Sequence, residues 1–201
     1  MREGFVDLAE FVPGLRCEIR YATAHNLTGH PLAGYLAPRA LAAREAAEAL
    51  ASAFARAQAQ GFGLLVYDAY RPQKAVLDFA AWAARPEDGR TKAEFYPAVD
   101  KSRLFDLGYI ALRSGHSRGS TIDLTLTDPD GRPLEMGTCF DWMGDESHHG
   151  YAALPAETIA LRHLLKRLMT DAGFRPYENE WWHYTLENEP YPETYFDFDI
   201  E

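Results

Sequence analysis

The stretch from Ser114 to Leu126 reads SGHSRGSTIDLTL and places a histidine and an aspartate seven residues apart. Its second half alternates apolar and polar residues, which predicts a β-strand. An odd spacing prevents His116 and Asp123 from sharing one face of a continuous strand, but a turn at 117–119, next to flexible glycines, would fold the histidine back. The pair could ligate a metal ion, or a loop histidine could simply hydrogen-bond to a strand aspartate.

A second pair of chemically capable residues, Glu180 and His183, flanks two tryptophans in the sequence EWWH. A catalytic zinc site requires three protein ligands, an open position for water and a base near that water. In a helix these two residues would share a face, but the aromatic run favours a strand. We therefore expect Glu180 at the entrance of that strand, after Asn179. The other interpretation is an exposed glutamate beside an aromatic core strand.

Arg71 lies in the sequence DAYRP, where a strand is expected to turn into a helix. A guanidinium at such a turn can donate hydrogen bonds to an oxygen that gains negative charge during hydrolysis. A salt bridge to Asp68 or to another carboxylate is the competing interpretation.

The composition of the 201 residues is typical of one globular domain spanning 1–201, with 47% hydrophobic and 25% charged residues. A net charge of −10 argues against nucleic-acid and anionic-membrane partners and leaves a small-molecule substrate open.

No apolar run reaches the roughly 20 residues of a membrane span, and the N-terminal sequence lacks the features of a signal peptide, which predicts a cytoplasmic protein. Cys17 and Cys139 fit neither a disulfide framework nor a zinc pair, and homo-oligomer formation stays open.

The order of the expected elements predicts the fold class. Helix signals do not alternate strictly with strand signals, which favours an α+β domain whose central sheet is mainly antiparallel and flanked by helices. Residues 85–108 are expected to form a covering loop and 128–131 a turn. Helices are expected over 38–60, 72–84 and 155–172, and strands over 62–67, 109–112, 121–126 and 181–186.

Five segments together resemble the zinc D-alanyl-D-alanine dipeptidases, the type found in vancomycin resistance, and their bacterial relatives. They are YATAHNLTGHPLAGY at 21–35, GFGLLVYDAYRPQKAV at 61–76, SGHSRGSTIDLTL at 114–126, MGTCFDWM at 136–143 and EWWHYTLENEPYPETYFDF at 180–198. The resemblance runs nearly end to end, and His-x6-Asp combined with Glu-x2-His is highly specific. One departure is Gly115, where serine is expected in the resistance enzymes.

The resemblance implies one Zn²⁺ per chain, at the sheet, held by His116, Asp123 and His183. It also implies a catalytic role for Glu180, which would act on water, and for Arg71, which would stabilise the transition state.

The reaction expected from the resemblance is hydrolysis of free D-Ala-D-Ala to two D-alanines. Tyr21 and Ser114 are then expected to line the substrate pocket. Asp141, in a segment with few other charges, is the candidate partner for the substrate's ammonium group, with a turn cap as the alternative. The cellular role would be control of peptidoglycan precursors, as in glycopeptide resistance, or D-alanine salvage.

Two alternatives remain. A related D-Ala-D-Ala carboxypeptidase or peptidoglycan endopeptidase would share the metal motif, and a zinc-binding module without catalysis would lack the base. The presence of Glu180 argues against the second.

Overall fold

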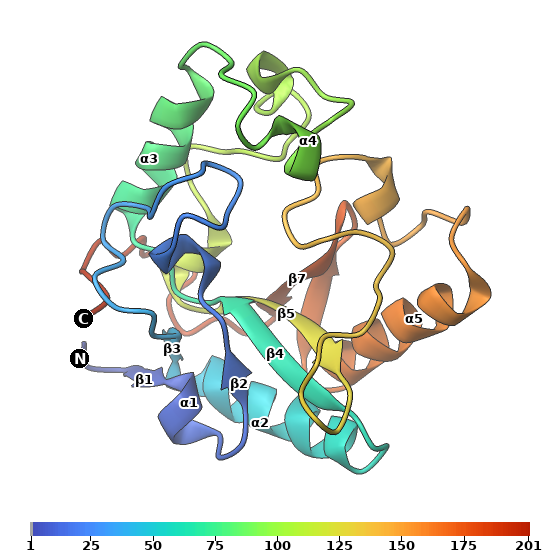
Figure 1. Ribbon diagram of the computed structural model, residues 1–201. Helices are drawn as coiled ribbons and strands as arrows, with labels where there is room; N and C mark the ends of the chain where they lie inside the picture. The colour runs from blue at the N-terminus through green and yellow to red at the C-terminus, as the bar shows by residue number, and fades with distance from the viewer. Residues whose placement is uncertain (1) are drawn as a thin grey trace.

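A five-stranded sheet forms the centre of the fold, with the strand order β2-β4-β5-β7-β6 (Figure 1). The computed structural model describes residues 2–201. The β2–β4 pair is parallel and the other three pairs are antiparallel, so the predicted α+β class with a mainly antiparallel sheet is confirmed. The strands are β2 (Arg16–Cys17), β4 (Gly63–Asp68), β5 (Thr121–Thr127), β7 (Glu180–Leu186) and β6 (Phe174–Tyr177).

Two long helices, α2 (Arg44–Gln58) and α5 (Ala156–Thr170), pack against each other and against strands of this sheet (Figure 1). Side chains alternate along β5, so the fully buried Ile122 and Leu124 lie on the face opposite to Asp123. Helices α3 (Gln73–Ala83) and α4 (Lys92–Phe95) lie away from α2 and α5. None of the helices in the described chain combines the length and the apolar character needed to cross a bilayer.

A small second sheet ties the N-terminal region to the start of α2. Strand β1 (Phe5–Asp7) pairs antiparallel with β3 (Leu41–Ala43), and the short helix α1 (Leu8–Phe11) follows β1. Within residues 2–201, four single-turn 3₁₀ helices complete the set of elements. They are η1 (Arg20–Ala22), η2 (Lys101–Arg103), η3 (Gly115–Arg118) and η4 (Asp145–Ser147).

The C-terminal segment returns to the N-terminal half, so that the two ends of the chain lie side by side (Figure 1). Ile200 forms a parallel bridge with Tyr35. Phe196 joins two turns at once: its N–H donates to Ser117 O at 2.8 Å, and its carbonyl accepts from Gln73 N–H at 3.0 Å. The C-terminal segment therefore fixes η3 relative to the start of α3.

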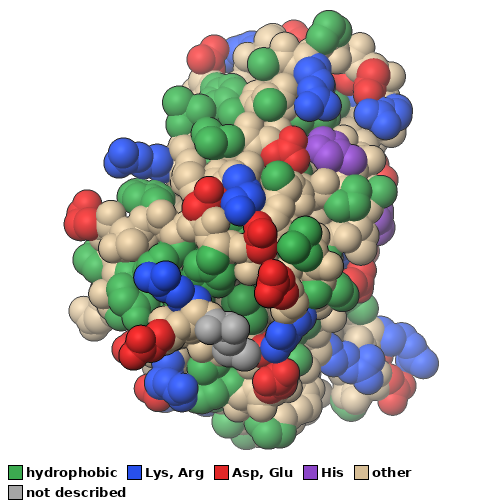
Figure 2. Space-filling model, turned by 90° about the vertical axis from the view of Figure 1, so that its left-hand side faces the viewer, with side chains coloured by type: hydrophobic (Ala, Val, Ile, Leu, Met, Phe, Trp, Pro, Cys, Tyr) green, Lys and Arg blue, Asp and Glu red, His purple; other side chains and the backbone are tan. Residues whose placement is uncertain are grey.

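The face around the termini carries acidic and basic side chains interspersed (Figure 2). Arg39 Nε lies 2.7 Å from Asp7 Oδ2, and Lys74 Nζ lies 2.7 Å from Asp199 Oδ1. The net charge of −10 is therefore not concentrated as a single-sign patch on this face.

The sequence-based elements are confirmed for β4, β5, β7, α3 and α5 within a few residues. The helix expected over 38–60 begins only at Arg44, because residues 41–43 pair with β1 and this pairing overrides the helix propensity of their alanines. The prediction of a strand over 109–112 is wrong, because the structure has no strand there. The backbone turns there, with the N–H groups of Tyr109 and Ile110 both donating to Leu104 O. The expected loop at 85–108 contains α4 and η2, and the turn after β5 is present, with Gly131 N–H donating to Asp128 O.

A matched pair of glycine substitutions tests the packing behind η3. Gly119 and Gly61 have nearly the same left-handed backbone, with φ of 80° and 82°. A Cβ at Gly119 would lie 2.5 Å from Phe5 Cε1, whereas a Cβ at Gly61 meets nothing within 4 Å. We expect Gly61→Ala to lower the free energy of unfolding by about 1–2 kcal/mol and Gly119→Ala to lower it further. Urea unfolding of both variants measures this; equal losses would contradict the close packing of Phe5 on η3.

Candidate active site

Three polar residues form a row across the middle of the sheet. Asp68 on β4 lies opposite Asp123 on β5, and Asp123 lies opposite His183 on β7. Directly opposed residues of antiparallel strands have their Cβ atoms about 4.5–5.5 Å apart, so their side chains meet on the same face. His183 Nδ1 accordingly lies 3.1 Å from Asp123 Oδ1. The antiparallel pairing thus brings together two residues that are far apart in the sequence.

His116 joins this row from the η3 turn, as expected if a turn folds the histidine back toward Asp123. Its Nδ1 lies 2.6 Å from the carbonyl oxygen of Ala69, and a carbonyl can only accept, so Nδ1 carries the proton. Nε2 is left with its lone pair toward the cavity, 3.2 Å from Asp123 Oδ2 and 3.4 Å from His183 Nδ1. Fixing one ring nitrogen in this way is how proteins orient a metal-ligating histidine.

The three side chains fit a metal ion. One potential ligand atom from each of His116, Asp123 and His183 lies within 4.8 Å of the others. Although His183 Nδ1 lies 3.1 Å from Asp123 Oδ1, this buried oxygen accepts no hydrogen bond, which is costly for a carboxylate oxygen unless a cation accompanies it. Two imidazole nitrogens and one carboxylate oxygen form a donor set typical of catalytic zinc.

The pKa values of Asp123, His116 and His183 in the metal-free cluster are set by burial and by the charges of the neighbouring groups. Burial raises the pKa of Asp123, but the two neighbouring histidines outweigh burial and hold that pKa well below its ordinary value. Burial lowers the pKa of His116. Burial acts likewise on His183, but Asp123 outweighs it and raises the pKa of that ring. The carboxylate is therefore ionised and available to a cation.

Glu180 reaches the same point from the first position of β7. The pairing of β6 with β7 is irregular here, since Pro176 lies opposite Tyr184 while the next residue, Tyr177, lies opposite Glu180. This irregularity lets Glu180 and His183 share a side although they are three residues apart. Glu180 Oε2 lies 3.4 Å from His183 Nδ1, and burial raises the pKa of the Glu180 carboxyl to about 7. The expected position at the strand entrance is confirmed, and an exposed glutamate is excluded because Glu180 is buried.

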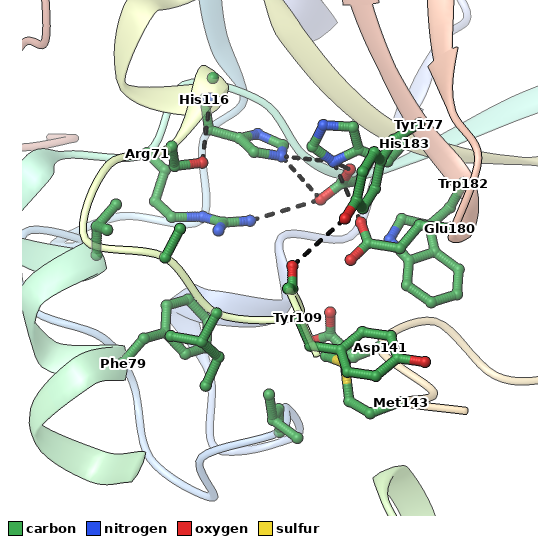
Figure 3. A pocket seen from close by; sticks show the side chains of 18 of the residues that line it. Arg71, Phe79, Tyr109, His116, Asp141, Met143, Tyr177, Glu180, Trp182 and His183 are labelled. Atoms are coloured by element: carbon green, nitrogen blue, oxygen red, sulfur yellow. Dashed lines mark hydrogen bonds and ion pairs between the residues drawn. The ribbon is translucent and has the colours of Figure 1, made fainter. Parts of the chain in front are cut away.

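Arg71 is paired with a carboxylate and also faces the cavity (Figure 3). Its Nε and Nη2 lie 3.0 and 2.9 Å from Asp68 Oδ2, and Nη2 is 3.5 Å from Asp123 Oδ2. Tyr35 donates to the other oxygen of Asp68 at 2.6 Å. The two interpretations of Arg71 are therefore compatible, because the salt bridge to Asp68 holds the guanidinium beside the candidate ligands.

The cavity in front of these groups has a volume of about 300 Å³, at the small end of ligand-binding cavities. Figure 3 shows Arg71 and His116 on one side of it and Glu180 and His183 on the other. Ser114 also lines the cavity, and its Oγ accepts from His116 N–H at 3.3 Å.

Asp141 and Tyr21 form the buried polar end of the cavity. The Tyr21 hydroxyl is 2.8 Å from each carboxylate oxygen of Asp141, and the carboxylate caps no turn. Burial raises the pKa of Asp141 well above its ordinary value. Asp141 is also the single non-glycine residue within 2–201 with a positive φ, 65°, a strained backbone of the kind that clusters at functional sites. A cation placed beside Asp141 would restore its ionised form.

Sequence reasoning missed the positioning roles of Asp68 and Tyr35. The sequence suggests Asp68 only as a possible salt-bridge partner of Arg71, yet Asp68 is fully buried and lies directly across from Asp123. The signal in the sequence was the aspartate three residues before Arg71, at the end of a strand. Tyr35 lies far from this stretch and left no local signal. The remaining histidines take no part in the three-residue cluster.

These features together are those expected of a metallohydrolase site: three candidate metal ligands, a carboxyl group of raised pKa beside them and a guanidinium facing the same cavity. Comparison with known proteins narrows the class. The family described as D-Ala-D-Ala dipeptidase matches residues 1–201, so the chain belongs to this family of metallopeptidases, and the predicted resemblance is confirmed.

Two relatives named D-alanyl-D-alanine dipeptidase agree with this assignment. A D-alanyl-D-alanine dipeptidase of Streptomyces coelicolor is 49% identical over 197 residues, covering 98% of this chain and 96% of the relative. The corresponding protein of Enterococcus faecium is 45% identical over 202 residues, covering 100% of both. Among solved structures, a zinc complex of a mutant of the vancomycin-resistance D,D-pentapeptidase VanY has a TM-score of 0.44 and 17% identity, covering 76% of each chain.

Removing a candidate ligand should weaken metal binding. We expect His116→Ala and His183→Ala to lower Zn²⁺ affinity by more than the roughly 10–100-fold that loss of an outer partner costs. Asp123→Asn should also weaken binding, because an amide oxygen replaces a charged ligand. Competition with a chromogenic chelator measures the affinity, and His163→Ala, an exposed histidine on α5, is the control. A fully loaded His116→Ala or His183→Ala protein would contradict the assignment.

Proposed function

We propose that this chain hydrolyses the free dipeptide D-Ala-D-Ala to two D-alanines, with one Zn²⁺ held by His116, Asp123 and His183. The observation that carries the proposal is that Asp123 and His183, paired across the sheet, meet the His116 ring and the Glu180 carboxyl in one small cavity. When bound, the ion supplies a Lewis acid and lowers the pKa of a coordinated water from 15.7 in bulk toward ~7.

Glu180 is the general base and acid of the proposed mechanism. It accepts a proton from the attacking water and then delivers that proton to the leaving amine. Its raised pKa, about 7, suits a group that must both take up and release a proton near neutral pH.

Arg71 stabilises the negative charge that develops on the carbonyl oxygen of the scissile bond. Asp68 holds the guanidinium through Nε and Nη2, so the donor is already oriented before the substrate binds. Such preorganised donors cost no rearrangement at the moment of reaction.

The polar end of the cavity supports selection of a free dipeptide. Asp141 would pair with the substrate's ammonium group, with Tyr21 fixing the orientation of the carboxylate. Ser114 would line the pocket beside the metal site. Burial raises the pKa of Asp141, and an ammonium group beside it would favour the ionised carboxylate and form a charge-assisted hydrogen bond with it.

The proposal includes the cytoplasm as the location and control of peptidoglycan precursors or D-alanine salvage as the role. A zinc-binding module without catalysis is disfavoured, because Glu180 is present and aimed at the candidate metal site. A carboxypeptidase or endopeptidase acting on cell-wall peptides is the second enzymatic candidate, and the substrate comparison described below separates it from a dipeptidase.

Glu180→Ala should retain zinc while losing turnover. General acid–base catalysis contributes about 10²–10⁴-fold, so we expect kcat to fall by at least that range. Single-turnover kinetics and metal analysis test this, with Glu178→Ala as the control because the Glu178 side chain is exposed and pairs with Lys166. Loss of zinc in proportion to activity would make Glu180 a ligand instead.

Arg71→Lys should fold and bind zinc but turn over slowly. A lysine keeps the positive charge but cannot reproduce the two guanidinium contacts to Asp68. Loss of one preorganised donor costs about 10²–10³-fold in kcat, whereas the exposed Arg56→Lys should have no effect. Near-normal turnover of Arg71→Lys would leave Arg71 with a structural role only.

The substrate comparison tests the function itself. D-Ala-D-Ala should be cleaved rapidly, whereas N-acetyl-D-Ala-D-Ala and a pentapeptide stem should be very poor substrates, because they lack the ammonium group at that position. Asp141→Asn should raise KM for the free dipeptide much more than it changes zinc content. Released D-alanine measures all three reactions. Equal cleavage of the acetylated dipeptide would favour the carboxypeptidase.

A further inference from the structure

The proposed substrate also carries a free carboxylate, which needs a partner in a cavity whose lining includes three acidic residues. Asp123, Asp141 and Glu180 all line it, and an acidic side chain offers no cationic partner to the substrate carboxylate. Among the described residues that line the cavity, Arg71 and Arg113 are the arginines, and no lysine lines it. Arg71 is already bound to Asp68 and lies near Asp123. The partner of the substrate carboxylate is therefore to be sought at Arg113.

The Arg113 guanidinium is available for an anion. The side chain is exposed at the cavity, and within residues 2–201 no carboxylate oxygen lies within 4.0 Å of it. Its guanidinium carbon lies 5.1 Å from the centre of the Tyr195 ring, which supports the side chain without neutralising its charge. A guanidinium in this setting can offer two parallel N–H donors to a carboxylate.

The backbone on both sides of Arg113 is held in place. Leu112 O accepts from Gln73 Nε2 at 2.8 Å, which ties this segment to the first residue of α3. On the other side, Ser114 Oγ accepts from the N–H of His116 at 3.3 Å. Arg113 is therefore fixed between the start of α3 and the turn that carries a candidate metal ligand.

We propose that Arg113 binds the C-terminal carboxylate of the dipeptide at the open side of the cavity. This inference rests on the proposed function and adds to it the recognition of the second charged end. Asp141 is buried and suits the ammonium group, whereas Arg113 is exposed and suits a carboxylate. The charges at the two ends would select a molecule with both termini free.

The experiment compares D-Ala-D-Ala with its C-terminal amide in the wild-type chain and in Arg113→Ala. A hydrogen bond to a charged group corresponds to about tenfold or more in binding, so we expect the wild type to prefer the free acid by about tenfold or more in kcat/KM. Arg113→Ala should lose this preference, mainly through KM for the acid, while cleavage of the amide stays unchanged. Arg113→Lys should keep part of the preference.

Arg103→Ala is the matched control, because Arg103 is exposed on η2 and does not line the cavity. Zinc content and Tm of each variant verify that the fold and the metal site are intact. If the wild type cleaves both substrates equally, or if Arg113→Ala keeps the preference for the acid, the assignment of Arg113 is wrong and the proposed function stands. If the wild type cleaves neither substrate, the proposed function itself fails, and the inference with it.

Discussion

The register between β5 and β7 is the constraint on which the site depends. It sets His183 opposite Asp123, while the neighbouring pair sets Asp68 opposite the same aspartate. Because side chains alternate with a period of two, a slip of one residue would turn His183 to the other face of the sheet. That face is packed with Ile122 and Leu124, both fully buried, so the hydrophobic core and the candidate metal site enforce the same register.

The opposed carboxylates carry an electrostatic cost that the neighbouring groups offset. Asp68 and Asp123 are both buried, and like charges directly opposite one another destabilise a sheet. Arg71 lies near both carboxylates, and the Tyr35 hydroxyl donates to Asp68 Oδ1. Each group therefore has a second partner that limits its movement, as is required of a buried polar network that must keep one geometry. The buried polar network that costs folding free energy therefore also holds the site in one geometry.

The sequence allowed the strands and the local motifs to be predicted better than the contacts between distant segments. The alternation at 121–126 and the aromatic run at 181–186 predicted β5 and β7, and the turn after His116 is present. The pattern could not show that residues 41–43 would pair with β1 instead of extending a helix, because that depends on a distant partner. The irregular pairing that aims Glu180 and the bridging role of Asp68 also arise from tertiary structure. The roles of individual residues were predicted from the family resemblance, because the hydrophobic periodicity of a sequence carries no information about residue roles.

The contacts of Phe196 with Ser117 and Gln73 have a consequence for biosynthesis. A chain grows from its N-terminus, so β4, η3 and β5 emerge before the strand and the C-terminal segment that complete their surroundings. His116 and His183 are 67 residues apart, and contacts of such long range form slowly. We therefore expect the nascent chain to expose an unpaired edge of β5 for a time, and the metal to be acquired late, after residues 183–200 have been added. The dependence of the site on its C-terminal segment would then protect the cell from a partly made, prematurely active hydrolase.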